Sequence, residues 1–74
     1  MYSFNFTYQN GVKIHFEHIK EVKYSKGGTG FTVSEDKIPL YSFPTGYDLH
    51  LFSEGKNITI NGKDLLFIEV QKET

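Results

Sequence analysis

The three histidines, His15, His18 and His50, have the widest chemical repertoire in the chain, because imidazole can bind a metal or exchange a proton near neutral pH. The spacing His15-x-x-His18 could contribute to a metal site. Residues three apart on a strand point to opposite faces, however, and His50 lies on the polar side of an alternating segment. With no cysteine to add a thiolate ligand, the pattern predicts solvated histidines, no metal site and no cofactor.

Acid–base and phosphate chemistry have one candidate each. Asp48 and His50 lie two residues apart and can project from one strand face as an acid–base couple, although an exposed polar pair is the simpler interpretation. Residues 26–30 (KGGTG) resemble a phosphate-binding loop in composition only, because no helical pattern follows them, and a hairpin loop is expected instead. No nucleophile elbow or other spaced catalytic signature is present. We therefore expect no enzyme, since so short a chain leaves little room for a catalytic pocket.

A run of lysines, Lys13, Lys20, Lys23 and Lys26, surrounds Tyr24. Lysines beside aromatic rings on a small barrel are typical of proteins that bind single-stranded nucleic acid, whose bases stack on exposed rings. Two glutamates interrupt the run, arginine is absent and the formal net charge is −1. A weak single-stranded nucleic-acid-binding β-barrel is therefore the alternative function, and an ordinary solvated face explains the lysines as well.

The length of 74 residues predicts one small domain, residues 1–74, with residues 71–74 frayed. Its core must be thin, and no disulfide can reinforce it. The first residues lack the pattern of a signal peptide, and no stretch approaches the roughly 20 apolar residues of a membrane-spanning helix. We therefore expect a cytoplasmic protein with no membrane partner. Abundant Lys, Asn, Ile, Phe and Tyr favour an AT-rich genome, such as that of a low-GC bacterium or a phage.

Turn signals such as Asn10-Gly11, Pro44-Thr45-Gly46 and Asn61-Gly62 recur at intervals of about ten residues, with short alternating segments between them. Residues 2–8 show the alternation most clearly, with aromatic side chains on one face and polar ones on the other. This pattern predicts an all-β fold: a small antiparallel partly open barrel or highly curved sheet of five to seven short strands, SH3-like or OB-like in size.

Two hairpin registers follow from matching apolar faces. A three-residue loop at residues 9–11, with a bulge at Gly11, brings the apolar residues of both strands to one face, whereas a two-residue turn would not. A two-residue turn at Glu54-Gly55 does the same for residues 47–60. The predicted core consists of these apolar residues: Phe4, Phe6, Ile14, Phe16, Leu49, Leu51, Ile58 and Ile60.

The middle and the end of the chain have weaker patterns. Ile19 and Val22 follow Phe16 at three-residue steps, which favours a kinked strand over a helical turn because no N-cap signal is present. Residues 38–43 are expected to form an edge strand or a strand end, since Pro39 within them and Pro44 just after them cannot donate to a ladder. A four-residue loop at residues 61–64 would place the last strand beside the two preceding isoleucines, although its register is ambiguous.

Leu65, Leu66, Phe67 and Ile68 put apolar side chains on both faces of one predicted strand. Pairing with a second copy would cover the extra face, so we expect a homodimer that forms through this segment. The alternative is a closed barrel in which residues 44–47 cover the outer face of this strand. The leading function is accordingly a small non-catalytic protein-interaction module with an unknown protein partner, as in an accessory protein of a phage or mobile element.

Overall fold

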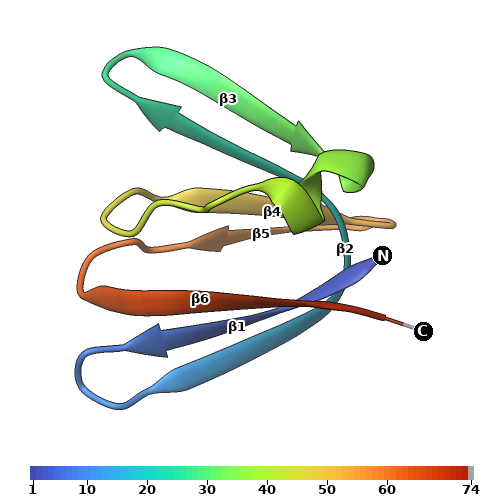
Figure 1. Cartoon of the computed structure of the whole chain (residues 1–74). Coiled ribbons are helices and arrows are strands. Elements are labelled where there is room, and N and C mark those ends of the chain that lie inside the picture. The colour runs from blue at the N-terminus through green and yellow to red at the C-terminus, as the bar shows by residue number, and fades with distance from the viewer. Residues whose placement is uncertain (74) are drawn as a thin grey trace.

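Six antiparallel strands and one short 3-10 helix make up the regular structure (Figure 1). The computed structural model describes residues 1–73. The elements are β1 (Tyr2–Tyr8), β2 (Lys13–Lys26), β3 (Thr29–Ser34), η1 (Glu35–Leu40), β4 (Leu49–Ser53), β5 (Lys56–Ile60) and β6 (Leu65–Lys72). They form one sheet in the order β5-β4-β2-β1-β6, and β3 pairs with β2. The sheet is strongly curved and is not closed, so the predicted fold class is confirmed.

β2 belongs to both halves of the curved sheet (Figure 1). Its first half pairs with β1, whereas its second half pairs with β3 along one edge and with β4 along the other. At His18 the backbone is left-handed, with φ +63°, and two residues of β2 face Ser3 at that point. Such bulges bend a strand and increase its twist. The predicted kinked strand is therefore confirmed, and residues 18–24 contain no helical turn.

The two hairpin registers predicted from face matching are confirmed. Gly11 has φ +88°, and its N–H donates to the Tyr8 carbonyl at 2.9 Å within a three-residue loop. In the other hairpin, Leu51 pairs with Ile58 across the turn at Glu54-Gly55. In both cases only one register buries the apolar face, and the turn glycines have the positive φ that this register requires.

Residues 38–43 do not form the predicted strand. Residues 35–40 form η1, with Pro39 inside it, and the chain then runs without regular structure to β4. We call residues 35–48 the strap, because Figure 1 shows this segment crossing the open side of the sheet in front of β4. The prediction was wrong because a proline also fits a short 3-10 turn, and because Ile38, Tyr41 and Phe43 point into a core that the strap itself helps to close.

The far end of the strap is fixed to the β5–β6 loop. The Gly46 N–H donates to the Gly62 carbonyl at 3.1 Å, and the Gly62 N–H donates to Asp48 Oδ1 at 3.0 Å. A Cβ atom at Gly62 would overlap the backbone of Tyr47. Glycine is therefore required at position 62 by the close approach of two backbones rather than by a positive φ.

β6 does not lie in the sheet beside β5, as the four-residue loop had suggested; it pairs with β1. The register shifts between Thr7 and Tyr8, so that Leu66 is an extra residue on β6. Leu65 therefore faces the core, but Phe67 lies on the outer face. The closed-barrel alternative is also wrong, since β5 and β6 are the unpaired ends of the sheet path and Leu66 and Phe67 are exposed.

A row of aromatic rings runs through the core. The contacts join, in order, Phe31, Tyr24, Tyr41, Phe43, Phe4, Phe6 and Phe16, with ring centroids 5.0 to 6.4 Å apart. Five of the eight predicted core residues are buried, namely Phe4, Phe6, Leu49, Leu51 and Ile60, and the other three pack half-buried against them. Because Tyr41 and Phe43 belong to the strap, these rings attach it to the sheet.

Both ends of the described chain are held in place. Residues 71 and 72, expected to fray, pair with β1, and the Glu73 N–H donates to the Met1 carbonyl at 3.2 Å. The same expectation for Thr74 lies outside the described residues. Within residues 1–73 we find no helix with the length and apolar content needed to cross a membrane.

The contact between Gly62 and Tyr47 leads to a prediction about stability. Gly62→Ala should destabilise the domain by roughly 2–4 kcal/mol, because the added methyl group must push the strap away from the β5–β6 loop. Gly30→Ala is the control, since open space surrounds that position and its φ is not positive. The control should be neutral or stabilising by about 0.5 kcal/mol. Urea unfolding of both variants measures the difference, and equal stabilities would contradict the prediction.

A second prediction concerns the hydroxyls of Tyr24 and Tyr41, which form a hydrogen bond with each other. Burial, the hydrogen bond and the charge of Tyr41 raise the pKa of Tyr24 from 10.0 to about 12. Because the pKa of Tyr24 is higher in the folded than in the unfolded state, its protonated hydroxyl stabilises the fold below pH 10. This stabilisation is lost as the pH rises towards about 12. Tyrosinate absorbance should therefore show a late step that Tyr24→Phe removes and Tyr47→Phe retains.

Candidate functional site

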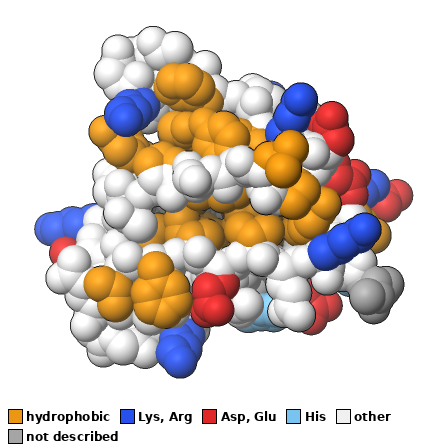
Figure 2. Space-filling view, viewed as in Figure 1, with side chains coloured by type: hydrophobic (Ala, Val, Ile, Leu, Met, Phe, Trp, Pro, Cys, Tyr) orange, Lys and Arg blue, Asp and Glu red, His pale blue; other side chains and the backbone are white. Residues whose placement is uncertain are grey.

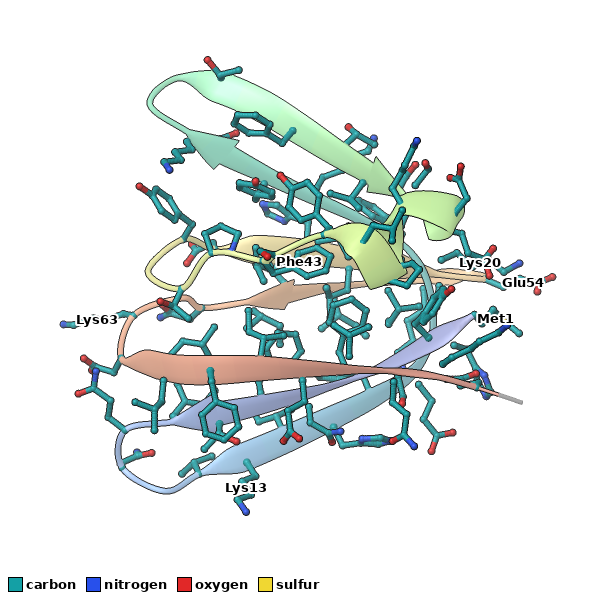
Figure 3. The ribbon with its side chains drawn as sticks, viewed as in Figure 1. Met1, Lys13, Lys20, Phe43, Glu54 and Lys63 are labelled. Carbon is teal, nitrogen blue, oxygen red and sulfur yellow. The ribbon has the colours of Figure 1, made fainter. Side chains whose placement is uncertain are left out.

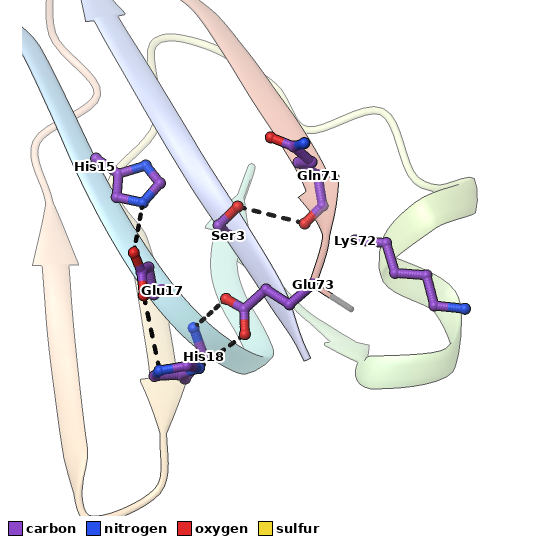
Figure 4. Close-up of a pocket in the computed structure, with 7 residues that line it drawn as sticks. All are labelled: Ser3, His15, Glu17, His18, Gln71, Lys72 and Glu73. Carbon is purple, nitrogen blue, oxygen red and sulfur yellow. Dashed lines mark hydrogen bonds and ion pairs between the residues drawn. The ribbon is translucent and has the colours of Figure 1, made fainter.

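Four polar side chains meet at the bend of β2 (Figure 4). The backbone N–H of His18 donates to Glu73 Oε2 at 2.6 Å, and its ring Nδ1 lies 2.7 Å from Glu73 Oε1. On the other side of the ring, His18 Nε2 lies 3.8 Å from Glu17 Oε2. The second oxygen of Glu17 lies 3.3 Å from His15 Nε2. We call His15, Glu17, His18 and Glu73 the bend cluster.

The prediction that His15 and His18 point to opposite faces is wrong. Both rings contact the carboxylate of Glu17, because the left-handed residue at position 18 breaks the alternation of the strand. His15 is also held from β1, where Asn5 Oδ1 lies 2.6 Å from its Nδ1. The bulge thus brings together two histidines that a regular strand would separate.

The bend cluster fastens the end of β6 to β2. It borders an open depression that Ser3 and Gln71 also line, and its histidines are exposed to solvent. In the part of the chain that the structure describes, no group of three or more histidine or acidic side chains is placed to hold a metal ion. The Glu73 pKa is lowered, mainly because the His18 backbone N–H donates to its carboxylate, with the His18 ring contributing further.

Asp48 and His50 do not form a couple. Asp48 precedes β4, and its carboxylate accepts the Gly62 N–H; His50 Nδ1 lies 3.2 Å from Thr59 Oγ1 on β5. Residues 26–30 are part of a hairpin, as expected, with Gly27 and Gly28 as its two turn residues at positive φ. Both groups of residues are thus explained by local structure.

The four lysines do not gather on one surface. Figure 3 shows Lys13 below the first half of β2 and Lys20 at the far right beside Glu54, because the bend of β2 separates them. Lys20 Nζ lies 3.5 Å from Glu54, Lys23 Nζ lies 3.9 Å from Glu21, and Lys26 lies over the ring of Tyr47. Tyr24 is buried, so its ring offers no exposed surface on which a base could stack.

The bulge in β6 places the four apolar residues of segment 65–68 in two different environments. Leu65 is buried and Ile68 packs against the core. Leu66 and Phe67, in contrast, are 55% and 44% exposed. Figure 2 shows apolar atoms over the left end of β6, set apart from the larger apolar band around the strap. Phe67 lies beside Thr7 of β1, which in turn pairs with Lys13 of β2. We call Leu66 and Phe67 the β6 patch.

Comparison with known proteins gives no match: no protein family, curated protein or solved structure is significantly similar to this chain. The bend cluster and the β6 patch therefore have to be interpreted from their own geometry.

The link between Glu73 and His18 predicts a pH dependence. A carboxylate whose pKa is lowered in the folded state stabilises the fold above its unfolded pKa, and this stabilisation is lost as the pH falls below it. Glu73→Gln should therefore unfold more easily at pH 7 and lose less stability than the wild type between roughly pH 5 and pH 3. Thermal unfolding across this range tests it. Glu54→Gln, which removes only a 3.5 Å contact to an exposed lysine, is the control.

Proposed function

We propose that the chain is a small non-catalytic protein-interaction module that contacts its partner through the β6 patch. One observation supports this most directly: two consecutive large apolar side chains, Leu66 and Phe67, stand exposed on the outer face of the sheet. A soluble domain has no structural need for such a pair, and exposed apolar groups of this kind commonly mark contact surfaces. The patch also sits on a sheet whose backbone holds it in a fixed shape.

The partner we propose is a second copy of the chain, in a two-fold dimer. Both signs of charge border the patch. Lys13 lies in the same cross-strand row as Phe67, and Glu69 follows two residues further along β6. A surface that is apolar at its centre and carries both charges at its rim can complement itself across a two-fold axis. A thin core also gains from a partner subunit.

The wider setting of the proposal rests on composition. We take the protein to act in the cytoplasm, as an accessory protein of a low-GC bacterium, phage or mobile element, because its residue usage and its lack of cysteine fit such an origin. The nucleic-acid alternative receives no support from the arrangement of its five residues.

Phe67→Glu tests this proposal. The wild type should form dimers at tens of micromolar in sedimentation equilibrium, whereas Phe67→Glu should weaken the dimer at least about tenfold, because two carboxylates would then be buried in the interface. Leu40→Glu is the matched control. Leu40 is 83% exposed but lies on η1, away from the patch, and its change should leave the dimer intact. A wild type that stays monomeric would overturn the proposal.

A further inference from the structure

β3 is an edge strand with an unpaired side. Within the described residues its only strand partner is β2, and no backbone hydrogen bond from a turn or loop reaches residues 29–34. Figure 1 shows the β2–β3 hairpin standing at the top of the molecule, with nothing beyond β3. A two-residue turn joins β2 to β3. The residues that flank this turn, Lys26 and Thr29, form a hydrogen-bonded pair, as is usual in such hairpins. By alternation, Gly30 and Thr32 turn their N–H and C=O groups outward.

This edge lacks the protection that the other edges have. β5 begins with Lys56, and β6 carries Glu69, Lys72 and a bulge, all of which discourage pairing with another chain. The sequence of β3, TGFTVS, contains no charged residue, no proline and no bulge. An edge of this kind is a ready site for an added strand.

The aromatic row of the core ends at this edge. Phe31 stacks on Tyr24 with ring centroids 5.0 Å apart and planes 17° apart, yet it remains 37% exposed. Tyr24 itself is buried. The ring of Phe31 is therefore covered on the β2 side and open on the side where a further strand would lie.

We propose that β3 pairs antiparallel with β3 of a second copy, across a two-fold axis at Phe31. In this register Gly30 forms a hydrogen-bonded pair with Thr32 of the other copy, and both residues have outward-facing backbone groups. The two Phe31 side chains then face each other at the close, non-hydrogen-bonded position, and the aromatic row continues from Tyr24 of one copy to Tyr24 of the other.

A second copy fits this edge because the strand complements itself. Two uncharged strands meet without repulsion, and the net charge of −1 opposes the approach of two chains only weakly. The pairing involves one short strand per chain, well below the roughly 1,200 Å² of a stable interface. We therefore expect a weak contact, with a Kd on the order of 100 μM to 1 mM.

This site is separate from the β6 patch and does not depend on it. In Figure 1, β3 lies at the top of the view, above β4 and β5, whereas β6 lies below them. Two different two-fold contacts on one chain link copies into assemblies larger than a dimer at high concentration, closed where the two axes intersect at a suitable angle and open rows otherwise. The β6 contact sets the dimer, and the β3 contact joins the dimers.

The test removes each contact in turn. Thr32→Pro deletes an N–H that faces outward and leaves the ladder to β2 intact, whereas Thr32→Ala keeps the N–H and is the control. Both are made in the Phe67→Glu background, so that only the β3 contact remains. Sedimentation at roughly 1 mM should show association of Phe67→Glu and of its Thr32→Ala form. Thr32→Pro should weaken that association at least tenfold. If the proline variant fails to fold, Thr32→Lys replaces it and should act through charge repulsion.

Amide NMR on a dilution series locates the contact. The amides of Gly30 and Thr32 should shift with concentration, whereas that of Thr59, on the β5 edge beside Lys56, should not. Phe67→Glu protein that stays monomeric at roughly 1 mM would overturn the β3 pairing and leave the β6 dimer standing. At tens of micromolar, where only the β6 dimer is expected, association that survives Phe67→Glu but is lost with Thr32→Pro would overturn the β6 dimer alone. Association of Phe67→Glu that is equal with alanine and proline at position 32 would also reject the β3 pairing.

Discussion

His18 adopts a left-handed backbone conformation in the middle of a fourteen-residue strand, and the bend at this residue sets how the two halves of the sheet are oriented to each other. For a residue with a side chain this conformation costs about 1–2 kcal/mol. The contacts with Glu73 offset this cost, because its carboxylate accepts a hydrogen bond from the backbone N–H of His18 and also contacts the Nδ1 of the His18 ring. The same bend turns β3 and β4 over β1, so that a single sheet encloses a core without needing a second layer.

The open side of the sheet is closed by side chains rather than by a seventh strand. Tyr41 and Phe43 reach from the strap to rings on β2 and β1, and Gly62 holds the end of the strap through backbone contact. This solution suits a chain with no cysteine and few residues, since aromatic rings bury much area per residue. It also leaves the outer faces and edges of the strands to meet other molecules.

Local patterns made part of this fold predictable. The hairpins at Gly11 and Gly55 join neighbouring segments, and only one register of each buries its apolar face, so matching faces was sufficient. The pairing of β6 with β1 and the path of the strap depend on contacts between distant residues, for which one sequence carries no periodic signal. The bend cluster was missed for the same reason. Glu73 meets His18 only after the sheet has formed, and a left-handed histidine has no sequence signature. The exposed Leu66 and Phe67 lie in the segment that the apolar run indicated, but the bulge that turns both outward was not foreseen.

The pairing of β1 with β6 joins the first and last segments of the described chain, from Tyr2 with Lys72 to Tyr8 with Leu65. In the sheet β1 lies between β2 and β6, and β6 is the last of the strands to be synthesised. While the ribosome is still synthesising residues 65–72, β1 has an open edge, and Phe4 and Phe6 lack the cover of β6. Contacts this distant in sequence also slow folding, because a loop of nearly the whole chain must close first. The nascent chain therefore passes through a stage in which a strand with two core phenylalanines is exposed, and this is the stage at which chaperones or aggregation compete with folding.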